Sequence, residues 1–234
     1  MKPFILMTTG RTGSTSLIDA LAAYDDIAVP NKQIDCVDNE IMHPNFFKKY
    51  LPFYQKYSKT PINNEVQLIN AFFLANQNSP FAGFKSMPER HQQLQALINT
   101  PSIQIITLIR NDIASTIASF IIAIDKSTWR RYGEKQNYSF TFDDSYKPRI
   151  LGHLKYILNS QLQLNAFPNA INLIYEDLCD PSYENPQLDT FFERKIKLQS
   201  PKKPTKARHY VNNWDEYFDF VNQSISSYNI KAPS

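Results

Sequence analysis

The sequence has little cysteine, no long apolar run and no marked excess of charge of either sign. Its 234 residues include two cysteines, Cys36 and Cys179, which have neither the spacing of a metal site nor the pattern of a disulfide framework. No apolar run approaches the ~20 residues needed to cross a membrane, and the apolar stretch after Lys2 is shorter than the roughly 7–15 residues of a signal-peptide core. These absences lead us to expect no metal, no integral membrane segment and a cytoplasmic location.

Internal repeats, low-complexity stretches and a strongly basic composition are also missing. A formal net charge of +3 suits an anionic small-molecule ligand, but it is too small to indicate nucleic-acid binding. Hydrophobic residues make up 42% of the chain, which is enough for a substantial core. We expect a single domain that spans residues 1–234.

The most informative segment that is present lies near the start. Its sequence is Thr8-Thr9-Gly10-Arg11-Thr12-Gly13-Ser14-Thr15, between the apolar run Phe4-Ile5-Leu6-Met7 and the apolar residues Leu17, Ile18 and Leu21. This order predicts a strand, a Gly-containing turn and an amphipathic helix. Such a turn directs backbone N–H groups to one point, where the helix dipole also favours an anion. A ligand with a phosphate or sulfate group is predicted there; the simpler alternative is a turn that only caps the helix.

The turn differs from two common nucleotide-binding motifs. The triphosphate P-loop has Lys between its last Gly and its Ser/Thr, whereas Gly13 is followed directly by Ser14. The cation, Arg11, lies inside the turn instead, and the dinucleotide fingerprint G-x-G-x-x-G is absent. These differences disfavour a kinase or a dehydrogenase.

A second candidate anion site follows the apolar segment 103–109, which has the composition of a strand buried on both faces. Arg110 stands at its end, and Asp112 is placed to cap a helix on which Ser119 lies about two turns in. An Arg at a strand end and a hydroxyl on the next helix can hold a second anionic group. The two sites together suit a ligand with two separated anionic ends.

Strands and helices alternate along the chain. We predict strands at 4–8, 27–29, 81–86, 103–109 and 171–175, and helices at 14–23, 45–57, 66–77, 89–98, 113–124, 149–165 and 214–226. Alternation of this kind predicts an α/β, P-loop-like three-layer fold with a central, mostly parallel sheet and helices on both faces. Segments 126–148 and 199–213 are expected to be irregular. In such sheets ligands bind outside the carboxyl ends of the strands.

At these motifs the chain resembles the sulfotransferases that use 3′-phosphoadenosine 5′-phosphosulfate (PAPS). The segment from Thr9 to Thr15 is similar to their 5′-phosphosulfate loop, and Arg110-Asn111-Asp112 followed by Ser119 is similar to their 3′-phosphate element. The Arg-x-Asp spelling and the nine positions from Arg110 to Ser119 are closest to bacterial carbohydrate sulfotransferases of the trehalose type. Weaker resemblances are Tyr175-Glu176-Asp177-Leu178 after the last strand and Asn39-Glu40-Ile41-Met42-His43-Pro44 after the second.

The resemblance implies PAPS as cosubstrate and adenosine 3′,5′-bisphosphate as product. It places the 5′-phosphosulfate on Gly10, Arg11, Thr12, Gly13, Ser14 and Thr15. The 3′-phosphate then lies on Arg110 and Ser119. It also implies that the basic segment 199–213 covers the nucleotide.

For catalysis, the resemblance makes Glu40 the general base; His43, three residues on, is the alternative. Arg11 stands where many relatives have Lys, and it can stabilise charge but cannot give up its proton as an acid. Lys85, at the end of the predicted strand 81–86, is expected to stabilise charge on the sulfuryl group or to hold an acidic acceptor. The alternative for Glu40 is a surface or helix-capping carboxylate, and the alternative for Lys85 is a solvent-facing lysine at the end of a strand.

The function expected from the resemblance is sulfuryl transfer from PAPS to a hydroxyl, of a carbohydrate or glycolipid, by in-line attack. Three alternatives remain open at this point: a P-loop kinase, a nucleotide-binding module without catalysis, and a polyanion- or RNA-binding protein. No motif identifies the acceptor, the residues that hold adenine or the oligomeric state.

Overall fold

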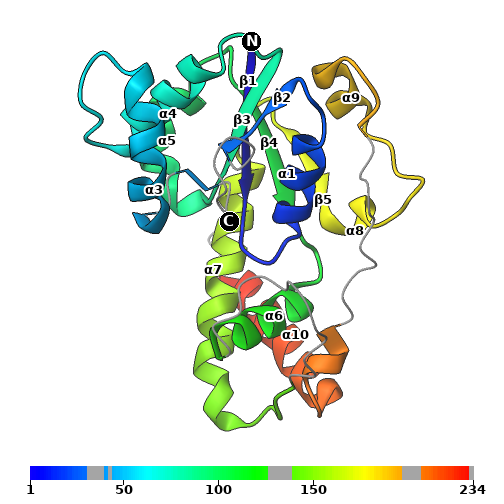
Figure 1. Cartoon of the computed structure of the whole chain (residues 1–234). Coiled ribbons are helices and arrows are strands. Elements are labelled where there is room, and N and C mark those ends of the chain that lie inside the picture. The colour runs from blue at the N-terminus through cyan, green and yellow to red at the C-terminus, as the bar shows by residue number, and fades with distance from the viewer. Residues whose placement is uncertain (31–39, 42–43, 126–138, 197–206, 232–234) are drawn as a thin grey trace. The chain divides into compact units, whose positions relative to one another are not determined.

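The computed structural model describes residues 1–30, 40–41, 44–125, 139–196 and 207–231. It divides into two compact units, which are described one at a time: Met1–Ile109 with Gln163–Pro201, and Arg110–Leu162 with Lys202–Ser234. Figure 1 shows the chain with its elements labelled. No helix in these described ranges is long and apolar enough to cross a membrane.

The first unit is built on a five-stranded sheet in the order β2-β3-β1-β4-β5. Its strands are β1 (Lys2–Thr8), β2 (Ile27–Ala28), β3 (Phe81–Ser86), β4 (Gln104–Ile109) and β5 (Ile171–Ile174). Every pair of neighbouring strands is parallel. The central strand β1 pairs on both sides, so that Ile5 lies beside Phe84 on β3 and Ile105 on β4.

Helices cover both faces of this sheet (Figure 1). One face carries α3 (Pro44–Tyr54), α4 (Glu65–Ala75) and α5 (His91–Ile98), and the other carries α1 (Ser14–Ala22), α8 (Tyr175–Leu178) and α9 (Pro186–Phe192). Two single-turn 3₁₀ helices, η1 (Gln55–Tyr57) and η2 (Pro88–Arg90), and the last turn of α7 also belong to the described part of this unit.

The alternation of side chains along β1 explains the two layers. Ile5 and Met7 pack among the buried residues of α3, α4 and α5, whereas Phe4 and Leu6 pack among those of α1, α8 and α9. All four side chains are fully buried, and each contributes about 1.5–3 kcal/mol by leaving water. The predicted three-layer α/β fold is confirmed, with a sheet whose described strands are all parallel.

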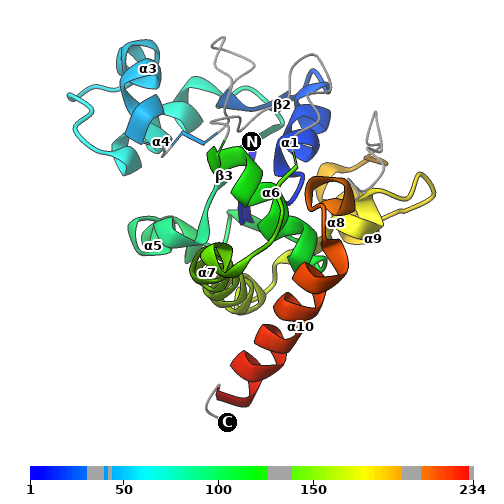
Figure 2. The same cartoon turned by 90° about the horizontal axis from the view of Figure 1, so that it is seen from below.

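The second unit is helical (Figure 2). It contains α6 (Ile113–Asp125), η3 (Asp144–Tyr146), all but the last turn of α7 (Lys147–Asn165), η4 (Ala207–Tyr210) and α10 (Trp214–Lys231). Side chains such as Ile117, Leu154 and Tyr217 form its core, and the Tyr217 hydroxyl donates to the Ala114 carbonyl at 2.7 Å. Of segment 126–148, which was expected to be irregular, residues 126–138 lie outside the described ranges; in the remainder Phe140 pairs with Val211, and η3 leads directly into α7.

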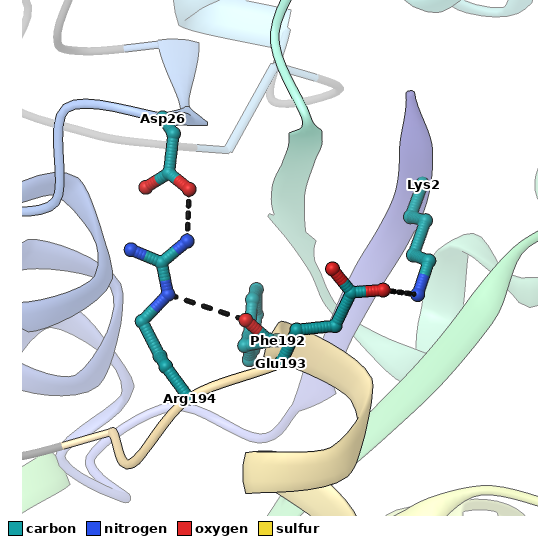
Figure 3. A network of polar contacts seen from close by, with 5 residues as sticks. All are labelled: Lys2, Asp26, Phe192, Glu193 and Arg194. Atoms are coloured by element: carbon teal, nitrogen blue, oxygen red, sulfur yellow. Dashed lines mark hydrogen bonds and ion pairs between the residues drawn. The ribbon is translucent and has the colours of Figure 1, made fainter.

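A polar network fastens the end of α9 to the sheet (Figure 3). Arg194 donates to the Asp26 carboxylate and, through Nε at 3.2 Å, to the Phe192 carbonyl. Lys2 Nζ lies 2.6 Å from Glu193 Oε1. The first pair is about one-third exposed, whereas the Lys2 and Glu193 side chains are 49% and 66% exposed, so water screens the second pair more strongly.

We therefore expect Arg194→Met to lower the free energy of unfolding by about 1–2 kcal/mol, because it removes two hydrogen bonds from a charged group. Lys2→Met is the matched control and is expected to leave the melting temperature nearly unchanged. Thermal unfolding of the two variants beside the wild type checks this, and equal shifts would show that Arg194 is no more important than a surface charge.

Candidate functional site

The turn between β1 and α1 has an unusual backbone. Arg11 and Gly13 both have left-handed conformations, with φ of 63° and 78°. Gly13 adopts it at little cost, whereas a residue with a Cβ loses roughly 1–2 kcal/mol there. Gly13 is also the N-cap of α1, and its carbonyl accepts from the N–H groups of Ser16 and Leu17 at 2.9 and 3.2 Å.

This backbone leaves donors open at the carboxyl end of the central strand. In the described ranges we find no acceptor for the backbone N–H groups of Gly13, Ser14 or Thr15, and the first turn of α1 contains no acidic residue. Left-handed residues beside a helix start bring successive N–H groups to one side, where the helix dipole adds positive potential. The turn has the geometry of an oxyanion site, and Arg11 supplies a cation within it.

Hydroxyl groups beneath the turn fix it to the sheet. Thr8 Oγ1 donates to the carbonyl of Leu108 on β4 at 3.0 Å and lies 2.5 Å from Thr12 Oγ1. The Thr12 hydroxyl donates to the Thr9 carbonyl at 2.9 Å, so both hydroxyls are used inside the protein and not on a ligand. The predicted contribution of Thr12 therefore rests on its backbone N–H alone, and Thr8 is a supporting residue whose role no sequence pattern indicated.

An aromatic ring packs against the same turn. A Cβ placed on Gly13 would overlap Cε2 and Cδ2 of Tyr175, the first residue of α8. Gly13 is thus required twice, by its φ and by the ring beside it. The position of Tyr175 directly after a strand placed it at the ligand edge, but no pattern in the sequence indicated its contact with Gly13.

Glu40 and Lys85 meet at this edge of the sheet. Lys85 lies on β3, where its Cα is paired with Leu6 of β1, and its Nζ is 2.7 Å from Glu40 Oε1. The Lys85 side chain is 5% exposed and the Glu40 side chain is 13% exposed. The sequence predicted the two residues separately, and the structure joins them as an ion pair. His43, the alternative base, lies outside the described residues.

The second predicted anion site belongs to the other unit. The Asp112 carboxylate accepts from the Ser115 N–H at 2.9 Å, which confirms it as the cap of α6. Arg110 is buried, and its carbonyl accepts from Gln161 Nε2 of α7 at 3.0 Å. Ser119 is half-buried on α6. A shared ligand for Arg110, Ser119 and the turn stays a prediction.

Comparison with solved structures supports the fold. The chain is similar to a crystal structure of a sulfotransferase from Alicyclobacillus acidocaldarius, with a TM-score of 0.52 and 14% sequence identity over 95% of this chain and 92% of that one. No protein-family model matches the chain, and no curated protein matches its sequence. At this identity the likeness shows a shared fold, in which the predicted P-loop-like architecture is confirmed.

Gly13→Ala is expected to destabilise the protein by at least about 2 kcal/mol, since it adds left-handed strain to an overlap with Tyr175. Gly152→Ala is the control. Gly152 lies inside α7 with open space where a Cβ would be added, so alanine there is expected to stabilise the protein by about 0.5–1 kcal/mol. Urea unfolding measures both, and a neutral Gly13→Ala would contradict the rigid turn described above.

Proposed function

We propose that the protein is a PAPS-dependent sulfotransferase that acts on a hydroxyl, of a carbohydrate or glycolipid. The observation that carries the proposal is the β1–α1 turn, whose open N–H groups and Arg11 lie at the carboxyl edge of the sheet that also carries the buried Glu40–Lys85 pair. The fold shared with a sulfotransferase structure supports the same reaction class.

The residues divide the work of an in-line transfer. The N–H groups from Thr12 to Thr15 and the Arg11 guanidinium bind the 5′-phosphosulfate, and Ser14 and Thr15 add hydroxyl donors. Glu40 accepts the proton of the acceptor hydroxyl as its oxygen bonds to sulfur. The bond from sulfur to the 5′-phosphate oxygen breaks, and Arg11 stabilises the charge that develops on the leaving phosphate.

The 3′-phosphate is assigned to Arg110 and Ser119, with Gly10 giving the turn room to approach the nucleotide. This assignment includes the proposal that both compact units act as one catalytic domain. Segment 199–213 is proposed to cover the nucleotide, although its residues up to 206 lie outside the described ranges.

The test is incubation of the purified protein with ³⁵S-labelled PAPS and a panel of sugars, glycolipids and phenols, with transfer followed by mass spectrometry. We expect a sulfated acceptor and one equivalent of adenosine 3′,5′-bisphosphate without added metal. A parallel reaction with Mg²⁺-ATP separates the alternatives: phosphate transfer there would show a kinase. Bisphosphate binding with no transfer to any acceptor would indicate a nucleotide-binding module.

Adenosine 3′,5′-bisphosphate is expected to raise the melting temperature far more than AMP, because only the bisphosphate fills both anion sites. At about 100 times its Kd a ligand adds about 2.7 kcal/mol to stability. Arg110→Met is the matched variant: it is expected to keep the AMP shift and to lose the extra shift. Equal shifts by the two nucleotides in the wild type would show that Arg110 and Ser119 do not bind a 3′-phosphate.

Arg11→Ala is expected to weaken bisphosphate binding and to slow transfer by about 10²–10³-fold, the usual effect of losing one donor at a developing oxyanion. Arg11→Lys retains the charge without the planar fork and is expected to recover part of the rate. Circular dichroism verifies that each variant is folded. A folded Arg11→Ala protein that transfers sulfate at the wild-type rate would show that the turn only caps the helix.

A further inference from the structure

The Glu40–Lys85 pair differs from the other ion pairs of the described chain in its burial. Neither side chain is more than 13% exposed, whereas each of the other ion pairs found in the described ranges includes a side chain that is at least 33% exposed. Two charges withdrawn from water in this way depend on each other, because either one alone would be left buried and uncompensated.

The two partners are held unequally by the fold. Lys85 belongs to β3, between β1 and β2, and its backbone position is fixed by parallel pairing on the β1 side from Phe81 to Ser86. Glu40 lies in neither a helix nor a strand. The ammonium group is therefore the fixed point, and the carboxylate is the group that is held.

The pair also changes the electrostatic role that the sequence suggested for Lys85. An ammonium in contact with a carboxylate forms a unit with no net charge, and such a unit attracts a sulfuryl oxygen only weakly. Arg11 is the cation that lies within the anion-binding turn itself, and its five donors suit an oxyanion. Charge stabilisation on the transferred group is then the work of Arg11 and the open N–H groups.

We propose that Lys85 is a positioning residue for the base: it holds the Glu40 carboxylate at the carboxyl edge of the sheet and does not bind the sulfuryl group. The proposal deepens the function proposed above, on which it rests for the role of Glu40. It reassigns Lys85 from the sulfuryl contact expected from the sequence to the proton-transfer step.

The decisive variant is Lys85→Met, which keeps an unbranched chain of similar length without the charge. We expect the affinities for PAPS and for adenosine 3′,5′-bisphosphate to stay within about twofold of wild type and KM for PAPS to be unchanged. We expect kcat to fall by about 10²-fold, the scale of a displaced general base. Lys85→Arg, which retains a donor to the carboxylate, is expected to recover part of kcat.

A double-variant cycle completes the test. Lys85→Met with Glu40→Gln is expected to transfer no more slowly than Glu40→Gln alone, because the lysine acts only through the carboxylate. The double variant is also expected to melt at a higher temperature than Lys85→Met, since it no longer buries a lone charge. This melting comparison needs no activity, so it tests the pair even if the protein proves not to transfer sulfate.

Two results would overturn the proposal. A Lys85→Met protein that loses at least tenfold in affinity for PAPS, but not for the bisphosphate, would place Lys85 on the sulfuryl group. Rate losses that multiply in the double variant would show that the two residues act independently. Absence of transfer by the wild type would instead refute the proposed function, and the melting temperatures would then decide on the pair alone.

Discussion

The backbone of the β1–α1 turn is the constraint on which the candidate site depends. Gly13 has a left-handed conformation and no room for a Cβ beside Tyr175, and Arg11 takes the same conformation at an energetic cost. The Thr8 hydroxyl holds the turn to β4 and is hydrogen-bonded to the Thr12 hydroxyl. Strain of this kind persists only where the surroundings fix it, and here the result is a set of N–H groups left open to a ligand.

The topology concentrates chemistry at one edge. Because β1 is the central strand and its neighbours are parallel, the turn after β1 lies beside the carboxyl end of β3. Lys85 is the next-to-last residue of β3, and Glu40, which follows β2 in the chain, forms an ion pair with it there. A turn with open N–H groups and a buried carboxylate thus lie at the carboxyl edge of one sheet, where open α/β sheets bind their ligands.

Much of this architecture could be predicted because its signals are local. The apolar run before residue 8, the glycines of the turn and the cap at Asp112 each depend on a few neighbouring residues. The helix α9 was missed, although Asn185 caps it and Pro186 opens it, because the helix has only seven residues and too short an apolar pattern.

The Glu40–Lys85 contact could not be predicted, because it joins residues 45 positions apart (85 − 40) across a strand order that no local pattern specifies. The contact of Tyr175 with Gly13 could not be predicted for the same reason. It depends on the order of the strands in the sheet, where β4 lies between β1 and β5. Local patterns identified the residues at the edge, and only tertiary structure shows which of them support one another.

In the complex proposed here, the open N–H groups of Gly13, Ser14 and Thr15 bind the 5′-phosphate of the nucleotide. Amide chemical shifts in a ¹⁵N-labelled sample, followed while adenosine 3′,5′-bisphosphate is added, measure this most directly. We expect the signals of the Gly13, Ser14 and Thr15 amides to move downfield and saturate together, while the signal of the Gly152 amide on α7 does not move. Saturable shifts elsewhere, with these three amides unchanged, would contradict it.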